Sequence, residues 1–129
     1  MDSGFYIAVF HLRRPRLIRV GRLGQFHFPP GTYLYVGSAR RNLPARIARH
    51  ARADKTLRWH VDYLSTRAEM IGAILIPADW RGPRSPAAPP DDAGMECRIA
   101  RALATACPRF IAGFGASDCR CGGHLFIVK

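Results

Sequence analysis

The sequence predicts an α/β fold of the α+β type, with a small antiparallel or mixed sheet flanked by helices. The chain has 129 residues, which is a length typical of one domain, and 48% of them are hydrophobic, enough for a folded core. Short segments rich in β-forming residues alternate with segments of helical periodicity. No segment repeats another, so we expect a single domain over residues 1–129.

The amino-terminal part of the chain predicts the strands of this sheet. Residues 4–12, GFYIAVFHL, are apolar and rich in β-forming side chains. Residues 16–28 contain two short alternating segments around two glycines, which predicts an extra β-hairpin. After the break at PPG, residues 32–37 predict a further strand, and Tyr33 and Tyr35 share one of its faces because side chains alternate along a strand.

Two helical segments follow. Asn42 is a favourable N-cap residue and Pro44 is tolerated in a first helical turn, so a helix is predicted over about residues 42–53. A second helix is predicted over residues 57–69. Its inward-facing residues are predicted to be Leu57, Val61 and Leu64.

The remaining elements alternate in the same way. Residues 70–77, MIGAILIP, predict a buried strand, because the segment is apolar and too short for a membrane span. The Pro-rich residues 81–94 predict an exposed loop. A third helix is predicted over residues 95–107, and a closing strand over residues 124–129.

The charge balance points to a polyanionic partner. Lys and Arg total 20 against 9 acidic residues, which gives a net charge of +11, and only Lys55 and Lys129 are lysines. Arginine binds phosphate in a planar, two-pronged way. We therefore expect a nucleic acid as partner, ahead of a membrane surface. A surface charge that serves solubility is the alternative.

The sequence carries no signal for secretion or for a membrane span. The first apolar run is short and no basic region precedes it, and the later apolar runs are also too short to cross a bilayer. We expect a cytoplasmic protein without a membrane partner. The four cysteines should then be reduced thiols or metal ligands rather than disulfides.

The stretch from Tyr33 to His50 is the first candidate site. A strand, a glycine turn and a basic helix bring Tyr33 and Tyr35 close to Arg46 and His50, and the last two share a helical face because they are four residues apart. Hydroxyls aimed at clustered cations suit a bound anion. The alternatives are a solvated basic face and ordinary packing of the tyrosines. Further candidates for nucleic-acid contacts are Arg40, Arg41, Arg49 and Arg52.

Glu96 is the second candidate for a functional residue. On a helical wheel it falls within the apolar stripe of the third predicted helix, close to Leu103 and Cys107. A carboxylate that faces a core is costly unless it is paired, protonated or bound to a metal. A place in the first turn, where the helix dipole favours it, and a salt bridge to an arginine are the alternatives to a metal ligand.

Two tripeptides carry a resemblance to a known family. GFY (residues 4–6) and YVG (residues 35–37) resemble the motifs that name the GIY-YIG nuclease superfamily, with Phe5 and Val36 in place of isoleucine. Taken in order, further segments resemble its DUF123, or Uri-type, branch over nearly the whole chain. These segments are GRLG, GTYLYVGSA, RIARH, WHVDYL, MEC and GFGASDCRCGGHLF.

The resemblance implies a GIY-YIG-like fold and an endonuclease that hydrolyses phosphodiester bonds in nucleic acid, and we expect DNA as its substrate ahead of RNA. It implies Tyr6, Tyr35, Arg46 and His50 as catalytic residues, with the two tyrosines on neighbouring strands, and Glu96 as the ligand of Mg²⁺ or Mn²⁺. One tyrosine, left open, would pass a proton from the attacking water. Arg46 would hold a non-bridging phosphate oxygen. Relatives of this branch occur fused to base-excision repair enzymes, which suggests repair or recombination.

The chain departs from the superfamily pattern at two points. The hairpin region, residues 13–31, is longer than in compact members. An asparagine that often closes the site has no match, because Asn42 is the only asparagine and precedes Arg46. A catalytically weak nucleic-acid-binding module of the same fold is therefore the alternative function.

The carboxy-terminal residues Cys119, Cys121 and His124 form a C-x-C-x₂-H pattern. Zinc takes four ligands, and this spacing is tighter than that of common zinc ribbons. We favour two small buried thiols beside a glycine turn. A zinc-stabilised interaction domain is the third hypothesis, with a fourth ligand drawn from Cys97, Cys107 or His60.

Overall fold

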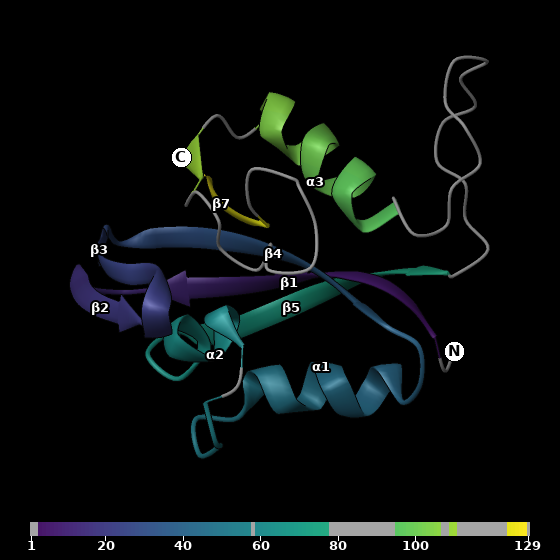
Figure 1. The fold of residues 1–129 in the computed structure, drawn as a ribbon, viewed down its shortest axis with the longest axis horizontal. Coiled ribbons are helices and arrows are strands. Elements are labelled where there is room, and N and C mark those ends of the chain that lie inside the picture. The colour runs from purple at the N-terminus through teal and green to yellow at the C-terminus, as the bar shows by residue number, and fades with distance from the viewer. Residues whose placement is uncertain (1–2, 58, 78–94, 107–108, 111–123, 129) are drawn as a thin grey trace.

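The computed structural model describes residues 3–57, 59–77, 95–106, 109–110 and 124–128. These residues form a sheet with the strand order β5-β1-β4-β7-β6, and its four neighbouring strand pairs are all antiparallel. Helices lie on both faces of the sheet (Figure 1), so the predicted α+β class is confirmed. The strands are β1 (Gly4–Leu12), β4 (Gly31–Ala39), β5 (Glu69–Pro77), β6 (Arg109–Phe110) and β7 (Leu125–Val128).

The predicted hairpin is also present. Strands β2 (Arg16–Val20) and β3 (Gly24–Phe28) pair antiparallel as a separate two-stranded sheet, joined by a short 3-10 turn, η1 (Gly21–Leu23). Gly21 has a φ of +50°, a conformation that glycine adopts without strain. The buried face of the hairpin joins the main core through Ile18, Val20 and Phe28.

Alternation along the central strands divides the core into two layers. Tyr6, Tyr33 and Tyr35 belong to one hydrophobic cluster, which also receives the first helix, α1 (Leu43–Ala51). Ile7 and Val36 belong to the other cluster, which receives the last described helix, α3 (Met95–Ala106). The prediction that Tyr33 and Tyr35 share a face is therefore confirmed.

Helix α1 lies where the sequence predicts it. Asn42 is its N-cap residue, but the cap differs from the expected one. Asn42 adopts a left-handed conformation, with φ of 54° and ψ of 46°, and its side chain makes no capping hydrogen bond. Asparagine tolerates this region better than most residues, so it provides a sharp turn from β4 into α1. Pro44 lies in the first turn, as predicted.

The second helix is shorter than predicted. Helix α2 (His60–Ser65) begins only after Trp59, whose backbone is extended. The Asp62 carboxylate accepts a hydrogen bond from the Trp59 backbone N–H at 2.9 Å, which fixes the helix start at this point. The prediction for Leu57 was wrong, because it precedes the helix and is 45% exposed. Val61 and Leu64 are buried as predicted.

The remaining elements agree with the prediction except in burial. The predicted strand at residues 70–77 is β5, yet Ile71, Ile74 and Leu75 are exposed. The prediction of a buried strand was wrong because β5 is an edge strand of the described sheet and pairs with β1 alone. The third helix and the closing strand are confirmed as α3 and β7, whereas the predicted loop at residues 81–94 lies outside the described residues.

Candidate active site

The GFY and YVG motifs meet on neighbouring strands. The antiparallel register of β1 and β4 places Tyr6 directly opposite Gly37. A Cβ atom built on Gly37 would lie 2.4 Å from the Tyr6 hydroxyl oxygen, a distance that side chains do not tolerate. Glycine is therefore required at position 37 because the ring of Tyr6 occupies the space a side chain would fill. The last residues of the two motifs form one steric unit.

The hydroxyl of Tyr6 reaches across the core to helix α1. It lies 2.6 Å from Nε2 of His50, within hydrogen-bond distance, and Tyr6 and His50 are only 2% and 1% exposed. The rings of Tyr35 and Trp59 surround the imidazole, with ring centroids 5.9 Å and 6.1 Å from it. The structure thus brings together three of the predicted catalytic residues, Tyr6, Tyr35 and His50.

The environment of His50 keeps its imidazole neutral. Burial, together with the positive charges of Lys55, Arg49 and Arg46 and against the opposing effect of Asp62, lowers the pKa of His50 from 6.5 to about 4. A neutral imidazole has one nitrogen that accepts a hydrogen bond. In the tautomer that carries its proton on Nδ1, the Tyr6 hydroxyl donates to Nε2.

The second imidazole nitrogen is unusual. Nδ1 of His50 is buried without a hydrogen-bond partner among the described residues. A buried polar atom left unpaired in this way costs about 1–3 kcal/mol, so folded proteins rarely keep one. Such an atom, beside a buried tyrosine hydroxyl, marks this layer of the core as chemically distinct from ordinary packing.

Arg46 lies one helical turn before His50, at the margin of the same cluster. It is half-buried, and its Nη1 donates a hydrogen bond to the carbonyl oxygen of Ser38 at 2.6 Å. Its guanidinium carbon lies 4.9 Å from the centre of the Trp59 ring, a cation–π contact. Helix α1 and the end of β4 thereby hold the guanidinium in a fixed position, and the planar group has further N–H donors to offer an anion.

Arg49, predicted to contact nucleic acid, already has several partners within the fold. Its Nη1 and Nη2 donate to the two carboxylate oxygens of Asp62 at 2.7 Å and 3.0 Å. Its guanidinium carbon also lies 4.4 Å from the centre of the Trp59 ring. Asp62 is completely buried, so this two-pronged ion pair joins α1 to α2 behind His50.

Lys55 completes the same charged group. Its Nζ lies 3.9 Å from Oδ1 of Asp62 and donates to the backbone carbonyl of Arg49 at 2.9 Å. Burial lowers the pKa of Lys55 below 10.5, while Asp62 opposes that effect. Sequence reasoning did not identify Asp62 as this anchor. A signal was available, since an acidic residue three positions after a helix N-cap commonly caps the backbone there.

The other predicted nucleic-acid contacts are exposed at the two ends of α1. Arg40 and Arg41 lie in the turn that precedes the helix, and Arg52 is its C-cap residue. These three side chains are placed where an extended anion could reach them.

Glu96 lies on helix α3, and its side chain is outside the described residues. Helix α3 packs through Ile99 against Ile7, on the face of the sheet opposite to Tyr6 and His50 (Figure 1). The helix that carries the predicted metal ligand therefore lies on one face of the sheet, and the predicted proton-transfer groups lie on the other.

The predicted zinc pattern is described only at its last residue. His124 is buried directly before β7, and its backbone carbonyl accepts a hydrogen bond from the Val36 N–H at 3.0 Å. Cys119 and Cys121 lie outside the described residues. Within the described part of the chain, no three His, Cys, Asp or Glu side chains form a group able to hold a metal ion, and no helix there is long and apolar enough to cross a membrane.

Comparison with known proteins places the chain in one family. No curated protein and no solved structure matches it significantly. A family model described as a domain of unknown function, DUF123, matches residues 5–129, which include Phe5 and Tyr6 of the first motif, the whole YVG motif, helix α1 and the carboxy-terminal strand. This chain therefore belongs to the DUF123 family.

Proposed function

We propose that this protein is a metal-dependent endonuclease that hydrolyses phosphodiester bonds in DNA, with a role in repair or recombination. One observation carries the proposal: the Tyr6 hydroxyl lies 2.6 Å from a histidine that its surroundings keep neutral. The resemblance of the GFY and YVG motifs to those of GIY-YIG nucleases agrees with it. The net charge of +11 suits a polyanionic substrate.

The hydrogen bond distinguishes the roles of the two motif tyrosines. A free tyrosine hydroxyl has a pKa of about 10, so it takes a proton from water only if a neighbour accepts its own proton. His50 Nε2 is in hydrogen-bond distance of Tyr6. We therefore assign Tyr6 as the group that receives the proton of the attacking water, and Tyr35 as a residue that packs against His50 and orients it.

Substrate binding would adapt His50 to this role. A pKa of about 4 makes the free imidazole a weak base, because burial and nearby cations oppose its protonation. A phosphodiester held close to Arg46 and His50 brings negative charge and raises the pKa of the imidazole towards neutrality. The proton of Tyr6 can then pass to Nε2. Proton transfer would thus be favoured only when the substrate is in place.

Arg46 would bind the scissile phosphate. Its guanidinium is held by Ser38 and Trp59 before any substrate arrives, so little reorganisation is needed when negative charge develops on a non-bridging oxygen. The exposed Arg40, Arg41 and Arg52 would contact flanking phosphates. Such contacts position a nucleic acid and carry little base information, so we expect weak sequence preference.

A divalent metal is part of the proposal, with Glu96 as its protein ligand. The described residues hold no three-ligand group, but a single carboxylate is compatible with Mg²⁺ or Mn²⁺, because Mg²⁺ usually keeps several waters. When bound, the ion would supply positive charge for a phosphate and a more acidic water. Because α3 lies on the opposite face of the sheet from Tyr6 and His50, the proposal requires the substrate to bring a phosphate within reach of both groups around an edge of the sheet.

Glu96→Gln tests the metal assignment. The substitution preserves size and removes the charge, so cleavage should fall by roughly 10²-fold or more. The melting temperature should be unchanged or higher if the carboxylate faces the apolar stripe as the helical wheel predicts, since an unpaired carboxylate there is costly. Single-turnover cleavage and thermal unfolding are measured on one preparation. A destabilised variant that cleaves at the wild-type rate would contradict the assignment.

Incubation of the pure protein with labelled DNA tests the proposed activity itself. The substrates are a single strand, a duplex, a flap and a junction, each with Mg²⁺, with Mn²⁺ and with EDTA, and matched RNA strands serve as controls. We expect metal-dependent cleavage of at least one DNA structure and weaker cleavage of RNA. Cleavage that persists in EDTA, or no cleavage of any substrate, would contradict the proposal.

One observation favours a second candidate, a nucleic-acid-binding module without efficient catalysis. Tyr6 and His50 are almost completely buried, and a buried hydroxyl–imidazole hydrogen bond can serve to stabilise the fold alone. This candidate predicts tight, salt-dependent DNA binding with no cleavage in the same set of reactions.

A further inference from the structure

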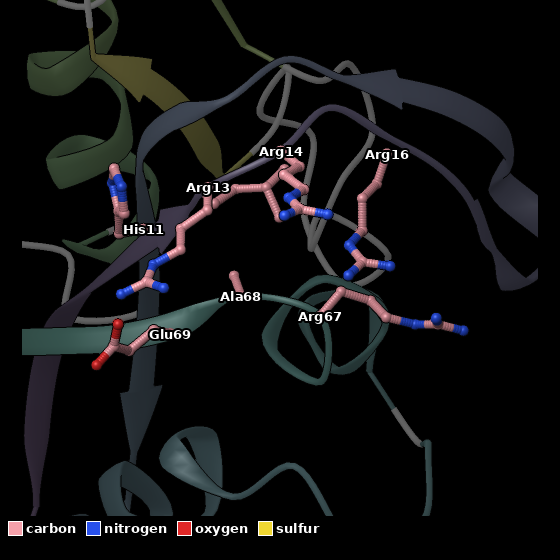
Figure 2. Close-up of a pocket in the computed structure, with 8 residues that line it drawn as sticks. His11, Arg13, Arg14, Arg16, Arg67, Ala68 and Glu69 are labelled. Carbon is pink, nitrogen blue, oxygen red and sulfur yellow. The ribbon is translucent and has the colours of Figure 1, made fainter.

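A second group of arginines lies at the opposite end of β1 from Tyr6. It lines a pocket of about 400 Å³, built from the turn after β1, the start of β2 and the segment that joins α2 to β5. Figure 2 shows Arg13, Arg14, Arg16 and Arg67 around this pocket, with Glu69 as its acidic residue. We refer to it as the arginine pocket.

The fold assembles the arginine pocket from distant parts of the chain. Strands β1 and β5 pair antiparallel, and their register places His11 opposite Glu69. This pairing brings the turn that carries Arg13 and Arg14 next to the segment that carries Arg67. The convergence is therefore fixed by the main sheet rather than by the flexible side chains.

Among the described residues, the arginines of the pocket have no carboxylate partner of the kind that Arg49 has in Asp62. All four arginines are exposed, and none forms an ion pair with an acidic side chain in the described part of the chain. Four arginines against one glutamate leave a net charge of +3 around the pocket. Gathered like charges repel one another, and a bound polyanion relieves that repulsion.

We propose that the arginine pocket binds the phosphodiester backbone of the DNA whose cleavage is assigned to the Tyr6 site, and the inference rests on that proposed function. Guanidinium groups bind phosphate oxygens in pairs, and several of them can hold more than one phosphate. No Phe, Tyr or Trp is among the residues that line the pocket, and His11 is the one lining residue with a ring, so the pocket offers little surface for base stacking. It would therefore hold the backbone without reading sequence.

The spacing of the two sites sets the length of DNA involved. Tyr6 and Leu12, which lines the pocket, are six residues apart on β1, and a strand rises about 3.4 Å per residue, which gives about 20 Å. Phosphates of one duplex strand are spaced by about 3.4 Å along the helix axis, so this distance corresponds to about six base pairs. DNA that reaches both sites must extend about that far from the scissile bond.

Removal of charge from the arginine pocket tests this inference. The variant is Arg14→Gln/Arg67→Gln, and the control is Arg98→Gln/Arg101→Gln on α3, which makes the same charge change on the other face of the sheet. Affinity for a labelled DNA hairpin is measured by fluorescence anisotropy in EDTA over a series of salt concentrations. Loss of two phosphate contacts should reduce the slope of log K against log salt by about 1.8, and the control should keep the wild-type slope.

Two further measurements separate the arginine pocket from the Tyr6 site. Wild-type protein should gain affinity when the hairpin stem grows from about 5 to about 16 base pairs, and the pocket variant should lack much of that gain. At saturating DNA, the pocket variant should retain the wild-type rate of single-turnover cleavage, since its substitutions do not touch Tyr6, His50 or Arg46.

The outcomes are distinct. Three results would overturn the inference. They are an unchanged salt slope in the pocket variant, an equal reduction of the salt slope in the control variant, and no DNA binding by the wild type. A pocket-dependent affinity for vesicles that contain phosphatidylserine, with DNA binding unaffected, would also overturn it and assign the pocket to a membrane surface. DNA binding that depends on the pocket in a protein that does not cleave would support the inference and contradict the proposed nuclease activity.

Discussion

His50 couples the stability of the fold to pH. In the unfolded chain its pKa is near 6.5, and in the folded protein burial lowers it to about 4. Between these values the unfolded state binds more protons than the folded state. The contribution of neutral His50 to the free energy of unfolding is therefore fully present above pH 6.5 and is lost as the pH drops towards 4. A shift of this size corresponds to about 3 kcal/mol in the free energy of unfolding.

Urea unfolding at pH 7 and at pH 4 measures this effect. The wild type should lose about 3 kcal/mol more stability between the two pH values than His50→Gln, which cannot titrate. His27→Gln, at an exposed position of β3, is the control and should behave as the wild type. An equal pH dependence in wild type and His50→Gln would show that His50 is not held neutral by the fold.

At the residue scale, the sequence predicted the members of the cluster better than the contacts between them. Strand alternation and helical spacing are local rules, and they are sufficient to predict Tyr35, Arg46 and His50 as members of the cluster. The Arg49–Asp62 ion pair joins residues 13 positions apart on two helices, and no local rule pairs them. The requirement for glycine at position 37 is equally non-local, because it arises from a ring on the neighbouring strand.

The packing of β1 against β4 requires glycine at position 37, where the ring of Tyr6 lies against the backbone. Gly37→Ala would place a Cβ atom 2.4 Å from the Tyr6 hydroxyl, which forces the ring or the strand to move. Overpacking of this kind costs about 1–3 kcal/mol, and it should also disturb the hydrogen bond to His50. Thermal unfolding of both variants makes the comparison. The control is Gly72→Ala on β5, where a Cβ would meet nothing within 4 Å, and its stability should match or exceed that of the wild type.

Helices α1 and α2 depend on the buried charge of Asp62. Asp62→Asn removes the negative partner of Arg49 and Lys55 and weakens the cap at Trp59, so the free energy of unfolding should fall by about 3 kcal/mol or more. Asp54→Asn makes the same change at an exposed position and should alter stability by less than about 0.5 kcal/mol. Chemical unfolding of the two variants gives the comparison. Equal stabilities would mean that the ion pair contributes nothing to the joining of the helices.

At the element scale, the errors of prediction share one cause. The start of α2 is set by a carboxylate that caps Trp59, and the exposure of β5 follows from its place at the sheet edge. Neither feature can be predicted from the periodicity of the segment itself, because both depend on contacts that form only in the folded structure. Strand alternation and helical periodicity were sufficient for β1, β4, α1 and α3.

In the whole molecule, the sheet separates two sets of groups. Tyr6, His50 and Arg46 lie on the α1 layer, and the helix that carries Glu96 lies on the other (Figure 1). The fold class followed from length and alternation, but this layering did not, because sequence order does not state which face a helix covers. The arginine pocket likewise required the β1–β5 register before its arginines could be grouped.

The proposed activity depends most directly on the hydroxyl of Tyr6, and a matched pair of variants isolates it. Tyr6→Phe removes the oxygen that contacts His50, whereas Tyr33→Phe removes another buried hydroxyl, which donates to the Pro29 carbonyl. Single-turnover cleavage of labelled DNA and thermal unfolding are measured for wild type and both variants. Tyr6→Phe should fold and bind DNA yet cleave it at least about 10²-fold more slowly, and Tyr33→Phe should cleave at the wild-type rate when folded. Cleavage by Tyr6→Phe as fast as by the wild type would contradict the assignment of Tyr6 as the proton-transfer group.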